Sequence, residues 1–224
     1  AAPGAPGGVP SGPFPEVTIP PVDEAAEDPS FHAFHQDLLR IIEARDVDGL
    51  LAIVDPAVRN DFGGGGGIDD FRSRWGLEGE QAASSPVWPL LSDLLELGGV
   101  FTDGGQAFVA PYVFVLYDQY ADELDPFYHS VVTGAGVNVR AAPSLDSAVL
   151  ERVSHLVVRV LPADGERETT VTIDGRSYAW KKIQLPSGTI GYLADKYLWS
   201  PVGYRVRFDR HDDGWRLTFL LAGD

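Results

Sequence analysis

The end of the chain carries the pattern that most restricts how this protein can fold. Two runs, 204–210 and 215–220, alternate between apolar and polar side chains on either side of an Asp212-Asp213-Gly214 turn, which predicts a β-hairpin. Its large apolar side chains all fall on one predicted face: Tyr204, Val206, Phe208, Trp215, Leu217 and Phe219. Because an isolated hairpin with such a face is not stable in water, other elements must cover it.

The helices that could cover this hairpin are predicted near the start of the chain, before residue 100. Apolar residues recur at helical spacing over residues 30–45, 46–55, 68–75 and 86–97. Strand patterns follow at 100–102 and 107–117. We therefore predict that the hairpin joins strand 107–117 in one antiparallel sheet under the helices, so that residues 30–127 and 201–224 form one α+β domain.

The order of helices and strands in this domain is similar to the cone-shaped fold of nuclear-transport-factor-like, or cystatin-like, α+β proteins. The resemblance rests on order and spacing and not on a sequence motif. A run of five glycines, Gly63–Gly67, falls within the helical part. Since no regular element tolerates such a run at low cost, we predict a mobile loop there.

Residues 128–200 separate the two parts of the α+β domain and show strand patterns only. Two groups of motifs here resemble the opening and the end of a bacterial SH3-type domain: Gly134–Ser144 (GAGVNVRAAPS) with Val149-Leu150, and Trp180–Ile183 with Gly188–Tyr192 and Tyr197-Leu198. The resemblance covers residues 130–200 and implies a small all-β SH3-like barrel inserted into the α+β domain. Residues 162–179 depart from the family pattern, and we predict an extra hairpin that turns at Asp174-Gly175.

The N-terminal segment has a different composition. Residues 1–30 contain eight Pro, four Gly, five acidic residues and no Lys or Arg, so we predict a disordered, Pro/Gly-rich tether over residues 1–29. The sequence contains no Met and begins Ala1-Ala2, as a protein does after signal-peptide cleavage, although trimming would give the same start. We expect an exported protein, periplasmic or secreted, without a membrane span, because no apolar stretch approaches about 20 residues.

Composition and motifs argue against several functions. The net charge of −16 disfavours nucleic-acid partners, whose phosphates require Lys and Arg. The absence of Cys excludes disulfides, thiol nucleophiles and Cys-ligated zinc. The acids at 118–125 lack EF-hand spacing, and His32 and His35 lack a His-Glu-x-x-His motif, so we predict no metal and no cofactor. Neither a Gly-x-Ser-x-Gly motif nor a Walker loop occurs, and no catalytic residue is predicted.

Aromatic side chains on the SH3-like segment are the leading candidates for a binding surface. Tyr and Trp offer apolar area and a hydrogen-bonding tip at low entropic cost. We predict that five of them line a shallow groove: Tyr178, Tyr197, Trp199, Trp180 and Tyr192. Trp180 and Tyr192 are explained equally well as core residues of the barrel, so Tyr178, Tyr197 and Trp199 are the better surface candidates. By resemblance, the ligand would be a peptide, cell-wall material or an envelope protein.

Three arginines, Arg205, Arg207 and Arg216, alternate with the apolar side chains of the C-terminal hairpin and predict a cationic cluster on its other face. Such a cluster could bind an anion, or its members could pair with nearby acids. We therefore predict a non-enzymatic binding protein whose α+β domain is a scaffold or a second binding surface. Two alternatives remain open: a cell-envelope hydrolase with a carboxylate-based site in the α+β domain near the glycine run, and a structural partner in an envelope assembly.

Overall fold

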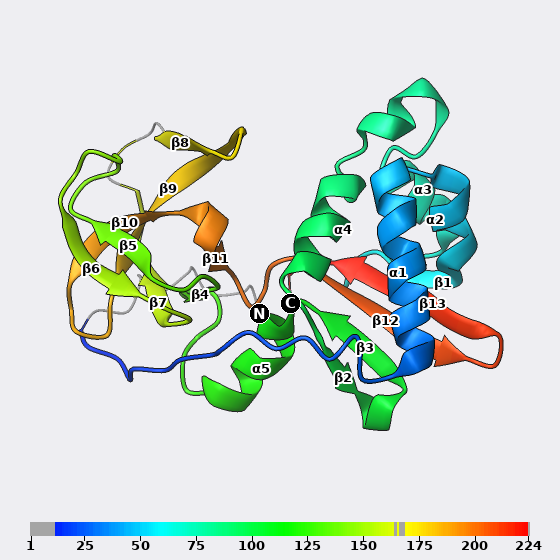
Figure 1. Ribbon diagram of the computed structural model, residues 1–224, viewed down its shortest axis with the longest axis horizontal. Coiled ribbons are helices and arrows are strands. Elements are labelled where there is room, and N and C mark those ends of the chain that lie inside the picture. The colour runs from blue at the N-terminus through cyan, green and yellow to red at the C-terminus, as the bar shows by residue number, and fades with distance from the viewer. Residues whose placement is uncertain (1–11, 164, 166–168, 224) are drawn as a thin grey trace, which may run out of the picture. The chain divides into compact units, whose positions relative to one another are not determined.

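The computed structural model describes residues 12–163, 165 and 169–223, and these residues divide into two compact units (Figure 1). The α+β unit is formed by residues 21–116 and 202–223, and the β unit by residues 12–20 and 117–201. The first contains helices on a sheet, whereas the second is built mainly from antiparallel strands. Within the described residues, no helix has both the length and the apolar composition needed to cross a membrane.

The helices of the α+β unit lie close to their predicted positions. They are α1 (Pro29–Ala44), α2 (Val47–Ile53), α3 (Ile68–Arg74) and α4 (Val87–Glu96), with short 3-10 helices η1 (Gly79–Ser84) and η2 (Asp103–Gly105). The carboxylate of Asp28 accepts hydrogen bonds from the backbone N–H groups of Ser30 and Phe31 and so caps α1. The apolar stripe of α1 is buried at Phe31, Leu38 and Ile42.

The sheet of the α+β unit has the strand order β1-β13-β12-β3-β2. Its strands are β1 (Val54–Arg59), β2 (Val100–Thr102), β3 (Ala107–Ala110), β12 (Arg205–His211) and β13 (Gly214–Leu221). The C-terminal hairpin pairs antiparallel with β3 through β12, which confirms the predicted pairing of the chain end with the upstream strand. β1 runs parallel to β13, however, so the sheet is mixed and the prediction of an antiparallel sheet is wrong at this edge. No tight turn joins β1 to its neighbour, so no hairpin imposes an antiparallel direction there.

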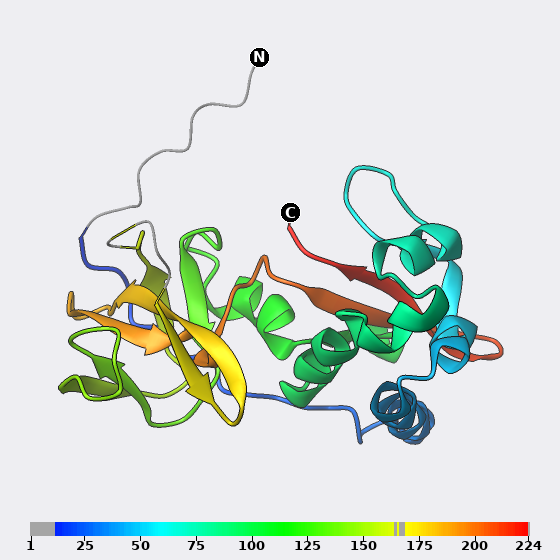
Figure 2. The same cartoon turned by 90° about the horizontal axis from the view of Figure 1, so that it is seen from above.

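The apolar face of the hairpin is covered by α1. The centroid of the Phe31 ring lies 4.2 Å from that of Phe108 and 4.9 Å from that of Trp215. Phe208 on β12 also contacts Phe31, at 5.9 Å between centroids. Figure 2 shows α1 and α4 on the same side of the sheet. The buried aromatic rings between α1 and the sheet therefore form the centre of this unit's core.

One predicted core residue of the hairpin, Phe219, lies on its other face. Phe208 pairs with Leu217, but its neighbour Arg207 pairs with Phe219, so one step along β12 is matched by two steps along β13. This irregularity is a β-bulge, and it shifts the alternation of side chains along β13 by one residue. Phe219 therefore shares a face with Arg207, and its predicted place among the apolar residues is wrong; Leu220 is buried there instead.

Residues 112–117, predicted as the second half of a strand, belong to a helix. β3 ends at Ala110, and α5 (Tyr112–Tyr120) begins directly after Pro111. A short apolar run fits a buried strand and a buried helix equally well by pattern alone. Pro has no backbone N–H, so it interrupts strand pairing and is tolerated at the start of a helix.

The β unit contains an antiparallel sheet with the strand order β11-β4-β7-β9-β10-β5-β6, and β8 pairs with β9 beside this path. The strands are β4 (His129–Val132), β5 (Val137–Arg140), β6 (Val149–Val153), β7 (Val157–Val160), β8 (Thr170–Ile173), β9 (Arg176–Gln184), β10 (Ile190–Ala194) and β11 (Leu198–Trp199). The main core is formed by Val132, Val137, Val139, Val153, Leu156, Val158, Ile183, Leu185 and Leu193. The predicted extra hairpin is confirmed: β8 and β9 are joined at Asp174 and Gly175, whose φ angles are 51° and 79°.

The N-terminal segment is packed against the folded units, so the predicted disordered tether over residues 1–29 is wrong for residues 12–29; residues 1–11 lie outside the described residues. In the β unit, Phe14 and Ile19 are buried, and the N–H of Ile19 donates to the carbonyl of His155 at 2.8 Å. In the α+β unit, the N–H of Glu24 donates to the carbonyl of Gly99 at 2.9 Å. Apolar burial and backbone pairing offset the ordering entropy, which Pro residues have already reduced in the unfolded chain.

Gly191 on β10 tests the packing of the β unit. A Cβ atom there would lie 2.9 Å from the carbonyl oxygen of Arg140 and 2.6 Å from a methyl carbon of Val139. We expect Gly191→Ala to lower the free energy of unfolding by about 1–3 kcal/mol, because the backbone of β5 cannot move away freely. Chemical denaturation measures this loss, and Gly165→Ala, whose Cβ would meet no atom of the described residues within 4 Å, is the control. Equal stability of the two variants would contradict the packing of β10 on β5.

Burial of Tyr112 makes the stability of the α+β unit sensitive to alkaline pH. The side chain is fully buried, and this burial raises the pKa of the Tyr112 phenol to about 12. The unfolded chain releases this proton near pH 10.0 while the folded protein keeps it, so the contribution to stability is complete below that pH and is lost as the pH rises toward 12.

We expect Tyr112→Phe to remove this part of the alkaline decline. The Tyr112 hydroxyl has no hydrogen-bond partner among the described residues, so its removal costs little at neutral pH. Urea unfolding of both proteins at neutral pH and above the ordinary phenol pKa measures the difference. An equally steep decline in the variant would assign the pH dependence to other groups.

Candidate functional site

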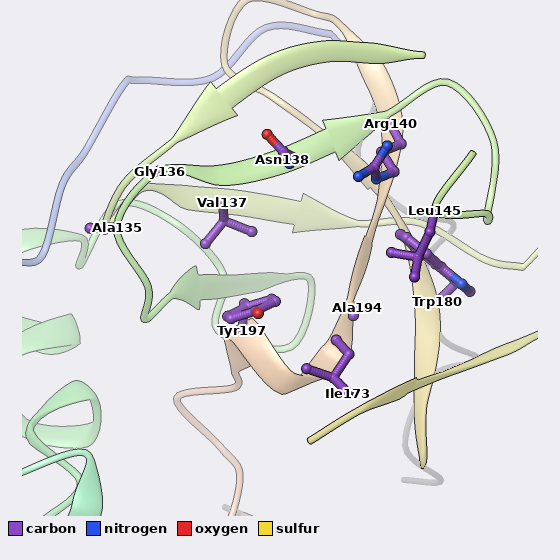
Figure 3. A pocket seen from close by; sticks show the side chains of 10 residues that line it. All are labelled: Ala135, Gly136, Val137, Asn138, Arg140, Leu145, Ile173, Trp180, Ala194 and Tyr197. Carbon is purple, nitrogen blue, oxygen red and sulfur yellow. The ribbon is translucent and has the colours of Figure 1, made fainter. Parts of the chain in front are cut away.

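A groove of about 200 Å³ opens on the β unit (Figure 3). Three parts of the chain form its walls: the turn before β5 with β5 itself, the loop after β5, and the β8–β10 region with the 3-10 helix η3 (Asp195–Tyr197). The residues that line it are Ala135, Gly136, Val137, Asn138, Arg140, Leu145, Ile173, Trp180, Ala194 and Tyr197. Segments up to about sixty residues apart in sequence therefore meet at one concave surface.

Trp180 and Tyr197 supply the aromatic surface of the groove. Figure 3 shows Tyr197 toward one end of the groove and Trp180 toward the other, with Ile173 and Ala194 between them on one side. Trp180 is only 9 % exposed and packs in a small cluster with Val171 and Ala194. Its ring is therefore held in place by packing and forms a fixed wall.

Asn138 and Arg140 are the polar residues of the groove, and both belong to β5. The Nη1 of Arg140 donates to the backbone carbonyl of Ser147 at 2.8 Å, which ties the strand to the following loop. The Nε of Arg152 donates to the Oδ1 of Asn138 at 3.0 Å. Arg140 forms no ion pair within the described part of the chain, so it places a positive charge at the groove.

Lys196 links the extra hairpin to η3 and helps to position Tyr197. Its ammonium group forms an ion pair with Asp174 at the β8–β9 turn, and this hydrogen bond raises the pKa of the Lys196 ammonium. The same nitrogen lies 5.8 Å from the ring centroids of both Tyr178 and Tyr197. The hairpin thus contributes Ile173 to the groove and stabilises the aromatic residue beside it.

Gly134, at the start of the first SH3-like motif, has a packing role at this site. A Cβ atom at Gly134 would lie 2.8 Å from a methyl carbon of Val137 and 3.2 Å from a ring carbon of Tyr197. Any larger residue would therefore displace two lining residues of the groove. Glycine at this position allows the Tyr197 ring to lie against the turn before β5.

The structure places the five predicted aromatic residues in three environments. Trp180 and Tyr197 line the groove. Tyr178 and Tyr192 pack against the same small cluster as Trp180 but are not among the lining residues. Trp199 lies on β11, which pairs with β4, and does not line the groove either.

Sequence reasoning named two of the ten lining residues, Trp180 and Tyr197, and missed the other eight, among them the polar residues Asn138 and Arg140 and the exposed Leu145. A signal for Asn138 and Arg140 was present, since they alternate with the core residues Val137 and Val139 within the first predicted motif. Leu145 is 56 % exposed in a loop, and its sequence context gave no indication of its position.

The structure brings together two of the three arginines predicted to bind an anion. Arg205 and Arg207 line a second cavity, of about 290 Å³, which lies in the α+β unit. Arg216 instead forms an ion pair at the hairpin turn and does not line this cavity. Arg207 forms ion pairs with Asp103 and Asp209, so the alternative of pairing with nearby acids applies to it.

The second cavity includes Phe62, next to the glycine run, where the hydrolase alternative would place its site. Asp103 is the one carboxylate among its lining residues, and it is paired with Arg207. The two facing carboxylates that glycoside hydrolysis requires are therefore not among these residues. Throughout the described ranges, no three His, Asp or Glu side chains lie close enough together to hold a metal ion.

No family model, curated protein or solved structure matches this chain significantly. The function is therefore inferred from the residues and the geometry of the sites.

Trp180 and Trp199 differ in burial, and their substitution separates a packing role from a surface role. We expect Trp180→Ala to lower the free energy of unfolding by about 3–5 kcal/mol, because a buried ring is removed. Trp199→Ala should cost less, since that side chain is only partly buried. Chemical denaturation compares the two variants, and a smaller loss at Trp180 than at Trp199 would contradict the fixed-wall role of Trp180.

Proposed function

We propose that the β unit is a binding module of the bacterial SH3 type, and that its groove binds an extended peptide of the cell envelope. This peptide is either cell-wall material or a segment of an envelope protein. The observation that carries the proposal is that Trp180 and Tyr197 lie at opposite ends of a groove whose lining is both apolar and polar, and that Arg140 adds a positive charge to it (Figure 3). A concave apolar surface with a few convergent polar groups is typical of a ligand site.

The location of the two motif groups supports an SH3-type module. The first group supplies one wall of the groove, from Ala135 to Arg140. The second supplies Trp180 and Tyr197. Residues that carry the family resemblance thus surround one groove, as expected if the resemblance reflects a shared binding function.

The chemistry of the groove favours a peptide that carries a carboxylate. Arg140 can form charge-assisted hydrogen bonds with such a group. The amide of Asn138 can donate to, and accept from, peptide backbone groups. The rings of Trp180 and Tyr197 can pack against apolar side chains of the ligand at low entropic cost. Cell-wall peptides and acidic protein segments both carry these features.

In this proposal the protein is exported, periplasmic or secreted, and does not act as an enzyme. The α+β unit serves as a scaffold or as a second binding surface. The charge distribution supports the assignment of ligand binding to the β unit. Residues 128–200 carry 8 basic and 7 acidic side chains, whereas the whole chain has a net charge of −16. The β unit can therefore approach an anionic ligand with little repulsion of its own.

Leu145 provides a test that does not depend on core packing. It lines the groove and is 56 % exposed, so Leu145→Ser should fold normally. We expect this substitution to weaken binding to purified wall sacculi by roughly tenfold, because the apolar contact between the Leu145 side chain and the ligand is removed. Co-sedimentation measures binding, and Leu150→Ser, at a 47 % exposed leucine on β6 outside the lining, is the matched control.

The charge of the groove is tested by Arg140→Gln, which should reduce binding in the same assay. If neither variant binds sacculi less than the parent protein, a pull-down from envelope extract with the same variants tests an envelope-protein ligand. Unchanged capture in both assays, or an equal loss in Leu150→Ser, would rule out the groove as the binding site.

A further inference from the structure

Residues 12–20 form a strap that is held on the β unit at two places. In its second half, Ile19 is fully buried, and its N–H donates to the carbonyl oxygen of His155 at 2.8 Å. The carbonyl oxygen of Val17 accepts a hydrogen bond from the N–H of Val157 at 2.9 Å. This half is therefore paired with the β unit like a short strand, whereas the first half is held by side chains.

The first half of the strap is held through the Phe14 ring, which contacts two neighbouring strands. Its centroid lies 5.0 Å from that of His129 on β4, in an edge-to-face arrangement, and 4.5 Å from the guanidinium carbon of Arg159 on β7. His129 and Arg159 are paired directly across these two strands. The Nη1 of Arg159 also donates to the carbonyl oxygen of Gly12 at 2.8 Å. One histidine and one arginine thus hold this end of the strap.

His129 is buried in a form that has no place for a second proton. It is 3 % exposed, and its Nδ1 lies 2.9 Å from the carbonyl oxygen of Asp125. Because a carbonyl oxygen only accepts hydrogen bonds, Nδ1 carries the proton of the neutral ring. Nε2, where a second proton would bind, is buried and has no hydrogen-bond partner among the described residues. Protonation would therefore place a charged N–H group in the interior without an acceptor.

The charges that face His129 come from Arg159 and Asp125. Burial lowers the pKa of the His129 imidazole, and the positive charge of Arg159 lowers it further. The hydrogen bond to the Asp125 carbonyl and the Asp125 carboxylate raise the pKa, but it stays below its ordinary value of 6.5. Of the other elements here, β11 has no charged residue, and Glu16 of the strap is exposed. His129 is therefore kept neutral by its place under the strap.

We propose that residues 12–16 are an acid-released end of the strap, which leaves the β unit when His129 binds a second proton. Once Phe14 moves away, the imidazolium and the guanidinium of Arg159 are both hydrated, and their repulsion falls. The pairing at Ile19 uses backbone groups, which do not titrate, so the second half of the strap stays in place. The acidic form then presents an aromatic and cationic surface that the neutral form covers.

The pH dependence of this release follows from the two pKa values of His129. In the open form the imidazole is solvated, with a pKa near 6.5, whereas the closed form holds the pKa below that value. The closed form is therefore fully favoured above pH 6.5 and loses stability as the pH falls below it. Because one proton is bound, the ratio of open to closed molecules rises by at most about tenfold per pH unit.

The strap can be observed directly, because the chain contains no Cys and one introduced thiol carries a spin label at a chosen position. Pro13→Cys places the label next to Phe14 at an exposed position. Thr18→Cys, at an exposed position next to Ile19, is the matched control. We expect the EPR spectrum of the Pro13→Cys label to gain a more mobile component between neutral pH and about pH 5, while that of the Thr18→Cys label does not change. An unchanged spectrum at Pro13→Cys, or an equal gain at both positions, would overturn the proposal.

Replacement of His129 tests whether this residue is the trigger. We expect His129→Phe, combined with Pro13→Cys, to abolish the acid response, because phenylalanine keeps an aromatic ring there and binds no proton. His35→Phe is the matched control: burial also lowers the pKa of His35, but this residue lies on α1, so the response should remain.

NMR of the unlabelled parent protein gives a second measurement that requires no substitution at His129. The titration midpoint of the His129 ring should coincide with the midpoint of label release. An acid response that persists in His129→Phe, or midpoints that differ by more than about one pH unit, would contradict the proposal. Neither residue of this test lines the peptide groove, so its outcome is independent of ligand binding there.

Discussion

Coverage of the C-terminal hairpin by α1 is the interaction on which the α+β unit depends. The Phe31 ring contacts aromatic residues of three strands, namely Phe108, Phe208 and Trp215. The last strands of the chain therefore complete a core that begins with its first helix, and such distant contacts carry a high cost in chain entropy. The same pairing of β3 with β12 and β13 places Val109, Arg207 and Phe219 together on the opposite face. One face of the sheet thus packs against α1, while the opposite face contributes to the lining of the second cavity.

Much of the fold could be predicted from the sequence, because periodicity and turn residues reflect local physical preferences. Helical spacing located α1 and α4, and alternation with a turn located the C-terminal hairpin and the β8–β9 hairpin. Other features depend on partners that are distant in sequence. The run from Tyr112 to Tyr117 fits a strand or a helix by pattern, and only its surroundings select α5. The parallel direction of β1 and the bulge that moves Phe219 are properties of strand pairs, so the sequence of a single strand does not reveal them.

The groove was only partly predictable for the same reason. Trp180 and Tyr197 could be named because Tyr and Trp suit binding surfaces, but Tyr178, Tyr192 and Trp199 were named on the same ground and do not line the groove. Leu145 could not, because its role depends on how a loop folds over neighbouring strands. The N-terminal segment shows the opposite error, since its composition is typical of disorder while Phe14 and Ile19 are buried. Two well-placed apolar side chains and a few backbone hydrogen bonds can outweigh an unfavourable average composition.

The placement of the N-terminal segment has a consequence for dissecting the protein. Residues 12–20 belong to the β unit, whereas the rest of that unit spans residues 117–201. A fragment cut to the longer span alone would lack Phe14 and Ile19 and would expose the apolar surface on which they pack. The β unit is thus discontinuous along the polypeptide chain. A fragment that folds on its own requires both segments, joined by an engineered linker or supplied as two complementary peptides.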